Sequence, residues 1–232
     1  MRTRSPVCLL NWRVALLLAA CAGVTPLAGC GANRLDVKVD IPPLLVVPLP
    51  LAMGVRIPKS FAEYVQKEKV RESEWEINLG SAQAEAIRRV MSALFAHTVL
   101  LGDPVAGEAV AAGQGLNGVI ETTLDSYVYL LPSPGASEFY SATIGFKVDL
   151  QSPEGKLLGS WVYEGYGSAP ERGLSASEGV ELVSGLAIRD ACANLAVHLP
   201  EQELIRNLLA PAPATTPAPA STVPDTQPAT GK

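Results

Sequence analysis

The stretch FYSATIGFKVDLQSPEGKLLGSWVYEGYG, residues 139–167, decides the fold because it predicts a long antiparallel hairpin. Its first half alternates apolar and polar residues, which is the period of a strand with one buried face. The turn SPEGK, residues 152–156, places Pro and Gly where the chain must reverse, and LLGSWVYEGYG, residues 157–167, returns as the partner strand. We expect the following positions to face the core: Tyr140, Ala142, Ile144, Phe146, Val148 and Leu150.

A third strand precedes this hairpin, in GVIETTLDSYVYLLP, residues 118–132. Strict alternation puts the even positions Ile120 to Leu130 on one face and the odd positions Glu121 to Tyr129 on the other. If the odd face is exposed, its tyrosines form a candidate interaction surface with aromatic residues of the next hairpin: Tyr127, Tyr129, Trp161 and Tyr163. In the alternative interpretation a helix covers that face and these aromatic residues belong to the core.

The N-terminal part of the body predicts further strands. VKVDI, residues 37–41, and LLVVPLPLAMGVRI, residues 44–57, carry their apolar residues on odd positions. Pro48 and Pro50 have no N–H group, and because they are two residues apart, both missing donors lie on the same edge of the strand. This indicates an edge strand or a strand that pairs fully on one side only. The polar segment that follows, residues 58–77, predicts a long excursion from the sheet that is either a binding surface or a solvated loop.

Two helices complete the pattern. Apolar residues recur at helical spacing from Ser81 to His97, and a capping box at Ser175 to Glu178 opens a second apolar helix that runs to Leu199. Cys192 lies in this second helix and is expected to be a small buried hydrophobic residue. The predicted fold is α+β, with a single small sheet, mainly antiparallel, and two principal helices packed on it.

The two ends of the chain differ in kind from this domain. The last segment, residues 210–232, is rich in Pro, Ala and Thr and has no aromatic residue, which predicts a disordered tail. Such a tail either stays solvated or reaches a partner or the peptidoglycan. The first 29 residues have a basic start, an apolar stretch from Val14 and small residues before Cys30, which are the three parts of a secretory signal. This apolar stretch is shorter than a membrane-spanning helix requires.

The end of the leader, Leu27-Ala28-Gly29-Cys30, resembles the lipobox of bacterial lipoproteins at every position. The resemblance implies that Cys30 carries a thioether-linked diacylglycerol with palmitate-type chains and becomes the first mature residue. Leu18 to Cys21 also matches, so Cys21 is the alternative site, although cleavage there would leave a very short apolar stretch. Gly31 stands where an Asp would signal inner-membrane retention, so the expected location is the periplasmic face of the outer membrane in the cell envelope.

The expected organisation is therefore a signal peptide over residues 1–29, a lipid-anchored tether over 30–35, a globular domain over 36–209 and the tail. The formal net charge of −5 argues against nucleic acid as a partner. GQGLNG, residues 113–118, fits a dinucleotide fingerprint by letters alone, but it precedes a strand instead of opening a helix. The two histidines, His97 and His198, lie far apart in the chain and are expected to be structural. We expect no enzymatic activity, cofactor or metal, and a hydrolase has no motif in its favour.

The order of elements in residues 36–209 is similar to that of small α/β domains in accessory envelope lipoproteins. These include relatives of curli and exopolysaccharide export lipoproteins, the TolB amino-terminal domain and auxiliary lipoproteins of envelope lipid transporters. The resemblance implies a non-catalytic accessory or assembly subunit of an envelope transport or export machine, bound to the membrane by its lipid and to an envelope protein or to further copies of itself. The alternative function is a periplasm-facing lipoprotein that binds a lipid or glycan.

Overall fold

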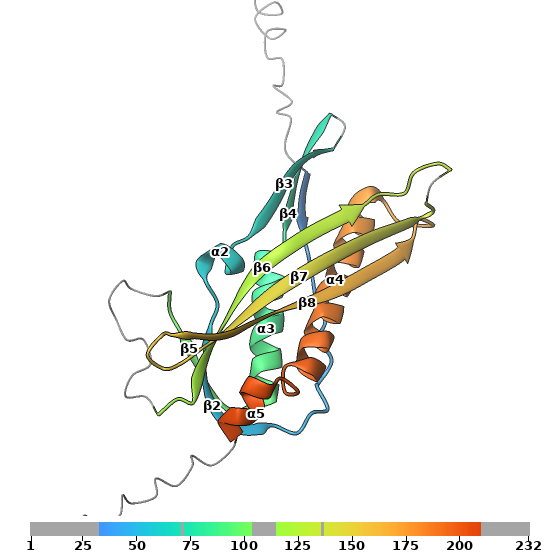
Figure 1. Cartoon of the computed structure of the whole chain (residues 1–232). Helices are drawn as coiled ribbons and strands as arrows, with labels where there is room; N and C mark the ends of the chain where they lie inside the picture. Colours follow the sequence, from blue (N-terminus) through green and yellow to red (C-terminus); the bar gives the residue numbers. More distant parts are fainter. Residues whose placement is uncertain (1–32, 71, 104–114, 136, 210–232) are drawn as a thin grey trace, which may run out of the picture.

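Three long neighbouring strands form one side of the larger of two sheets (Figure 1). They are β6 (Gly118–Leu130), β7 (Phe139–Gln151) and β8 (Leu157–Pro170). β7 pairs antiparallel with β8, which confirms the predicted hairpin, and all six predicted core positions of β7 are buried. This computed structural model describes residues 33–70, 72–103, 115–135 and 137–209, so the leader with Cys21 and Cys30, and the tail, lie outside the described residues.

The remaining elements, in chain order, are β1 (Asn33–Asp36), β2 (Leu49–Arg56), α2 (Lys59–Ala62), β3 (Val65–Val70), β4 (Ser73–Asn78), α3 (Gly80–Leu94), β5 (Phe95–Leu101), α4 (Ala176–His198) and α5 (Glu203–Leu209). The larger sheet has the order β5-β2-β6-β7-β8, with β2 parallel to both β5 and β6. The smaller sheet has the order β1-β4-β3, with β1 parallel to β4 and β3 antiparallel to β4.

The prediction of a single, mainly antiparallel sheet is therefore wrong. The polar segment 58–77, expected to leave the sheet, folds into α2 and the β3–β4 hairpin and forms a second sheet with β1. Parallel neighbours such as β2 and β5 require a crossover connection, and α3 lies within that connection. Alternation along a strand reports which face is buried, but it does not report which partner lies beside it.

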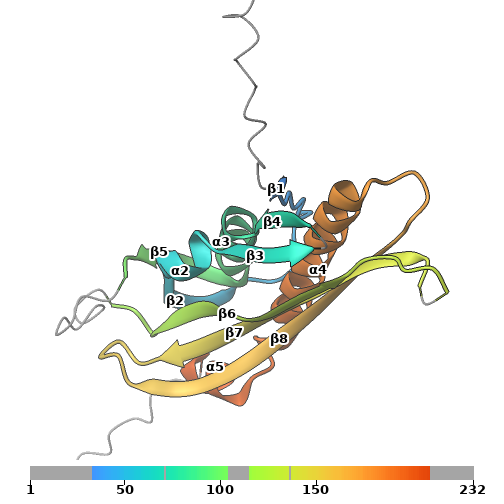
Figure 2. The ribbon, with the colours of Figure 1, turned by 90° about the horizontal axis from the view of Figure 1, so that it is seen from above.

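The helices α3 and α4 and the smaller sheet lie on one face of the larger sheet (Figure 2). The capping box of α4 is present, with Ser175 Oγ accepting from the Glu178 backbone N–H at 3.3 Å and Glu178 Oε2 accepting from the Ser175 N–H at 2.9 Å. α3 ends at Leu94, three residues before the expected end, so His97 lies in β5 instead of closing the helix. None of the described helices is long and apolar enough to cross a membrane.

Close packing between α4 and β8 depends on two glycines. A side-chain carbon on Gly165 would overlap the backbone of Ala187 and Ala191, and one on Gly167 would overlap the carbonyl oxygen of Val183. The helix backbone therefore rests directly on the strand. Cys192, on the same helix, is buried as expected, and burial raises the pKa of its thiol from 9.0 to about 12.

The N-terminal segment behaves differently from the predicted edge strand. β2 lies inside the sheet and is not an edge strand. The other predicted possibility was full pairing on one side only. It is confirmed, because β2 pairs with β5 along its length and with β6 only from Met53 onward. Before that point Asn117 takes the place of a strand neighbour: its Oδ1 accepts the Ala52 N–H at 2.8 Å, and its own N–H donates to the Ala52 carbonyl oxygen at 2.8 Å. Residues 37–41 lie against α3 and α4 as extended chain, with Val37 and Ile41 buried, and belong to neither sheet.

Candidate functional site

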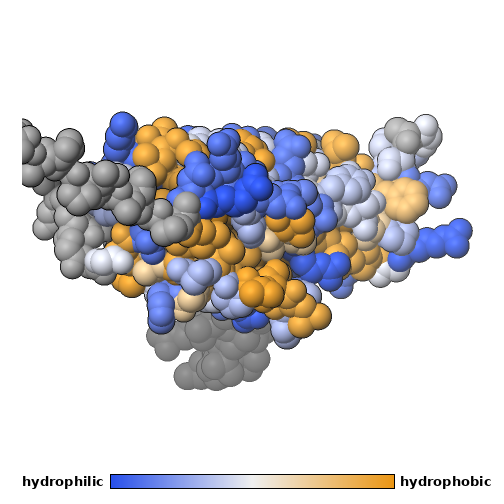
Figure 3. Space-filling view, turned by 60° about the horizontal axis from the view of Figure 1, so that its bottom comes forward, coloured by the Kyte–Doolittle hydropathy of each residue, from blue (hydrophilic) through white to orange (hydrophobic). Residues whose placement is uncertain are grey.

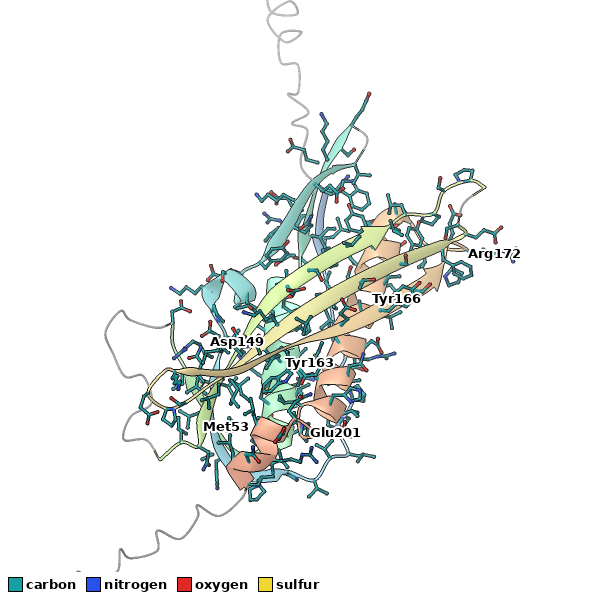
Figure 4. All side chains as sticks on the ribbon, in the orientation of Figure 1. Met53, Asp149, Tyr163, Tyr166, Arg172 and Glu201 are labelled. Carbon is teal, nitrogen blue, oxygen red and sulfur yellow. The ribbon has the colours of Figure 1, made fainter. Side chains whose placement is uncertain are left out.

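The four aromatic residues considered as an interaction surface lie on the helix-covered side of the larger sheet. The Tyr127 hydroxyl is 2.7 Å from Ser184 Oγ on α4, and the Tyr129 ring stacks between Trp75 and Tyr127, with ring centroids 6.5 and 6.0 Å away. Trp161 is half-buried and Tyr163 is buried, the latter near α5 (Figure 4). The structure does not bring these four residues together as an exposed surface, and their placement matches the alternative interpretation as core.

Burial also determines the chemistry of these phenols. It raises the pKa of Tyr127 to about 12, against the opposing hydrogen bond from Ser184. Burial likewise raises the pKa of Tyr163 to about 12. The pKa of Tyr129 is raised by burial first and by the neighbouring Glu68 carboxylate second. These hydroxyls keep their protons at neutral pH and serve packing.

A β-bulge in β6 causes this placement. Register with β7 shifts between Leu124 and Ser126, so that Asp125 is the extra residue and every later side chain changes face. Tyr127 then faces the helices, while Val128 and Leu130 face outward with 59% and 62% of their surface exposed. The expectation that Val128 and Leu130 share the buried face of Ile120 is therefore wrong.

The reversed residues belong to an uncharged surface at one end of the outer sheet face. Cross-strand rows join Val128 to Thr143 and Tyr166, Leu130 to Ser141 and Ser168, and Phe139 to Pro170. We call these eight residues the uncharged tip. Its apolar members are largely exposed, and the next outward row along the strands, Ser126, Gly145 and Glu164, already contains a charge.

A cavity of about 330 Å³ lies beside this tip, where the ends of several elements meet. It is bordered by the start of β1, the β3–β4 turn, the residues just after β6, and the start of α4. Its lining combines Trp75 and Tyr140 with Leu131, Pro132 and polar groups that include Asn33 and Glu171. Trp75 is not among the residues predicted for a site, although the two-residue spacing of Trp75 and Ile77 in SEWEIN is a strand signal.

A second exposed apolar feature is the extended segment before β2. Leu45 is 100% and Val47 is 89% exposed, while their neighbours Leu44 and Val46 pack on the core. Both exposed residues were expected on the apolar face, and they are not, because the chain enters β2 only at Leu49. Figure 3, which turns the lower end of the molecule forward, shows hydrophobic side chains among hydrophilic ones on the surface.

One buried charge lies at the other end of the outer sheet face. Arg56 Nη1 donates to Glu121 Oε2 at 2.9 Å and to Gln151 Oε1 at 3.1 Å, and Gln151 Nε2 donates to the same Glu121 oxygen at 3.3 Å. This triad joins β2, β6 and β7 through Nη1 of the guanidinium, whereas the buried Nε has no hydrogen-bond partner. Within the described residues, no group of three or more His, Cys, Asp or Glu side chains could hold a metal ion. His198 lies near Glu201, with Nδ1 and Oε2 3.1 Å apart.

Comparison with known proteins shows only distant likeness. No protein-family model matches the chain, and no curated protein matches it in sequence. A DUF330 family protein from Xanthomonas campestris is 10% identical, with a TM-score of 0.42, over 72% of this chain and 92% of that one. A candidate neuraminyllactose-binding hemagglutinin homolog from Helicobacter pylori is 10% identical, with a TM-score of 0.47, over 75% and 96%. A minor lipoprotein from Acinetobacter baumannii is 6% identical, with a TM-score of 0.39, over 66% and 92%. All three TM-scores lie below 0.5, so the comparison assigns this chain to no family.

Proposed function

We propose that this chain is a lipoprotein of the bacterial cell envelope, anchored through Cys30, that acts as a non-catalytic accessory or assembly subunit of an envelope transport or export machine. The observation that carries the anchor is the complete lipobox at residues 27–30, and Asn33, where β1 begins, is the third residue after Cys30. Three residues span at most about 10 Å, so the domain would sit against the membrane. Acyl chains on Cys30 hold it there, since each buried methylene adds about 0.8 kcal/mol.

The partner surface that we propose is the exposed segment at Leu45 and Val47. Two aliphatic side chains with nearly full exposure, on an extended backbone fixed by Leu44 and Val46, suit a protein groove that accepts alternate side chains. The segment enters β2, and α5 packs against β2, so the segment is continuous with the end of the domain where Leu209 closes the described chain. The partner in this proposal is an envelope protein or a second copy of the chain, in which case the surface forms a homo-oligomer.

Metabolic labelling tests the anchor. Cells that make the wild-type protein, Cys30→Ala or Cys21→Ala are fed an alkyne analogue of palmitate, and the purified protein is examined for label and for membrane fractionation. We expect label and membrane association in the wild type and in Cys21→Ala, and neither in Cys30→Ala. Label that persists in Cys30→Ala would assign the anchor to another residue, and loss of label in Cys21→Ala alone would assign it to Cys21. Separating inner from outer membranes on a density gradient tests the proposed location.

Site-specific photocrosslinking tests the partner surface. A benzoylphenylalanine at Val47 is compared in living cells with one at Lys156, an exposed position in the β7–β8 turn. We expect one reproducible adduct from position 47, and its absence from position 156 and from a Cys30→Ala background. The same adduct yield at both positions would contradict a specific surface, and adducts of doubled chain mass would identify a second copy as the partner.

The cavity beside the uncharged tip favours a second candidate function, the binding of a lipid or glycan. At about 330 Å³ it reaches the lower end of the range of small-molecule sites, and Trp75 supplies an aromatic wall. Titration of the purified protein with soluble muropeptides or short-chain phospholipids, followed by tryptophan fluorescence, tests this candidate. A saturable change that Trp75→Phe removes and Trp161→Phe retains would support it, and no saturable change would dismiss it.

A further inference from the structure

The uncharged tip exists because the β-bulge at Asp125 interrupts the regular alternation of faces along β6. Without the bulge at Asp125, Val128 and Leu130 would lie on the helix-covered face, and Tyr127 and Tyr129 would lie outside. The bulge instead exposes two aliphatic side chains and buries two phenols. Phe139, at the start of the next strand, is 50% exposed beside them. Exposed apolar side chains grouped in this way mark a surface that meets an apolar environment.

The surroundings of the tip contain few charges. The eight tip residues are all uncharged, and polar Ser and Thr side chains lie between the apolar ones. Charges return at its rim: Glu164 lies in the next row along the strands, Glu138 precedes β7, and Glu171 and Arg172 follow β8. Figure 4 labels Arg172 beyond the end of β8. Tyr166 contributes a ring with a polar end, as do the tyrosines found at the boundary between lipid headgroups and acyl chains. This composition fits an uncharged lipid boundary better than an anionic surface, because three of the four rim charges are acidic.

The position of the tip relative to the proposed anchor indicates that the tip contacts the membrane. Leu131 and Pro132 continue the chain directly from Leu130, and both line the same cavity as Asn33. Asn33 in turn follows Cys30 by three residues, a reach of about 10 Å at most. Figure 1 shows β1 and the far end of β6 toward the upper side of the molecule and α5 at the lower side. The membrane that holds Cys30 is therefore the apolar phase nearest to the tip.

We infer that the uncharged tip rests in the interfacial region of the bilayer that holds Cys30, with Val128, Leu130 and Phe139 among the upper acyl chains. This inference rests on the proposed function, because it requires the lipid on Cys30. The contact gives the domain a second point of attachment, so that it stands in one orientation instead of rotating about its tether. Leu45, Val47 and the end of α5 then face away from the membrane, toward partners.

A fluorescent probe that reports lipid contact tests the inference. The mature lipidated protein carries Leu130→Cys or, as the matched control, Val162→Cys, which is exposed on the same sheet face beside Lys147 but outside the tip. Each cysteine is labelled with an NBD maleimide, while Cys192 stays unlabelled because it is buried. The protein is reconstituted into vesicles of phosphatidylethanolamine and phosphatidylcholine, with and without brominated acyl chains. Circular dichroism confirms that both variants fold as the wild type does.

We expect brominated lipid to quench the probe at position 130 at least about twofold and to leave the probe at position 162 unchanged. Equal responses at the two positions would overturn the inference. A blue-shifted emission at position 130 without quenching would also overturn it, because protein and not lipid would then cover the tip. Palmitate incorporation, measured on the same samples, separates the two proposals: label without quenching refutes the tip contact and keeps the anchor, whereas absence of label refutes both.

Discussion

The backbone N–H of Tyr166 in β8 donates to the Asp190 carboxylate of α4 at 2.9 Å. Two residues away, the Asn194 side-chain amide donates to the carbonyl oxygen of Glu164 at 2.8 Å. β8 is the last strand of the larger sheet, so these side chains occupy backbone groups that another strand would otherwise pair with. α4 thus closes the middle of this edge against strand addition.

Removing that closure is expected to promote self-association. Asp190→Ala should lower the free energy of unfolding by about 1 kcal/mol, the typical net value of one hydrogen bond, and should raise the fraction of oligomer. Light scattering after size exclusion and urea unfolding measure the two effects. Arg189→Ala, at the exposed neighbouring position, is the control and should change neither quantity. A monomeric Asp190→Ala protein at high concentration would show that the edge is protected by other means.

The contact between β8 and α4 predicts a large loss of stability for Gly165→Ala. The added methyl group would overlap backbone atoms of Ala187 and Ala191, which cannot move without shifting the whole helix. We expect a loss of about 3 kcal/mol in unfolding free energy, at the upper end of overpacking effects. Gly102→Ala is the matched control, because its added carbon meets no atom within 4 Å. A small effect at position 165 would mean that the helix is not seated on the strand.

Alkaline pH should destabilise the domain, because the unfolded chain loses the proton of Cys192 first and that of Tyr127 next. Burial raises the pKa of Cys192 from 9.0 to about 12, and that of Tyr127 from 10.0 to about 12. The unfolded chain therefore releases these protons first, so the stability they contribute is full below pH 9.0 and is lost progressively from there up to about pH 12. Urea unfolding at a series of pH values measures this loss. Cys192→Ala should flatten the curve between pH 9.0 and 10.0, whereas an unchanged slope would contradict the buried thiol.

The Arg56 triad predicts non-additive substitutions. Arg56→Met leaves the partly buried Glu121 carboxylate without its ion partner and should cost about 2 kcal/mol. The double variant with Glu121→Leu should cost less than the sum of the two single variants, because no charge then remains in the triad. A double-mutant cycle in urea measures the coupling energy between the two residues. Additive effects would show that the ion pair between Arg56 and Glu121 contributes no coupling energy, and that each side chain stabilises the fold only through its own packing.

Local patterns were enough to predict several parts of the molecule. The alternation of residues 139–167 predicted the β7–β8 hairpin and its six core positions, and the capping box at Ser175 marked the start of α4. Both signals succeed because they depend on backbone geometry within a few residues. The same is true of Cys192, whose burial follows from its place on an apolar helix.

The candidate surfaces were less predictable. The sequence of β6 alternates regularly, but the extra residue Asp125 turns every later side chain to the opposite face of the sheet. A bulge arises from fitting two strands together, so the sequence of one strand does not reveal it. Leu45 and Val47 share the parity of Leu51 and Met53, yet they lie before the strand begins and stay exposed.

By itself, the sequence predicted the strands β2, β6, β7 and β8, the helices α3 and α4, the burial of Cys192, and two cysteines, Cys30 and Cys21, that match the lipobox pattern. Only the tertiary structure decided that two sheets form, that β2 lies between parallel neighbours, and that Val128 and Leu130 are exposed while Tyr127 is covered by α4. The division has a physical cause. Periodicity and capping act between residues close in the chain, whereas strand order, bulges and exposure depend on contacts between segments far apart in it.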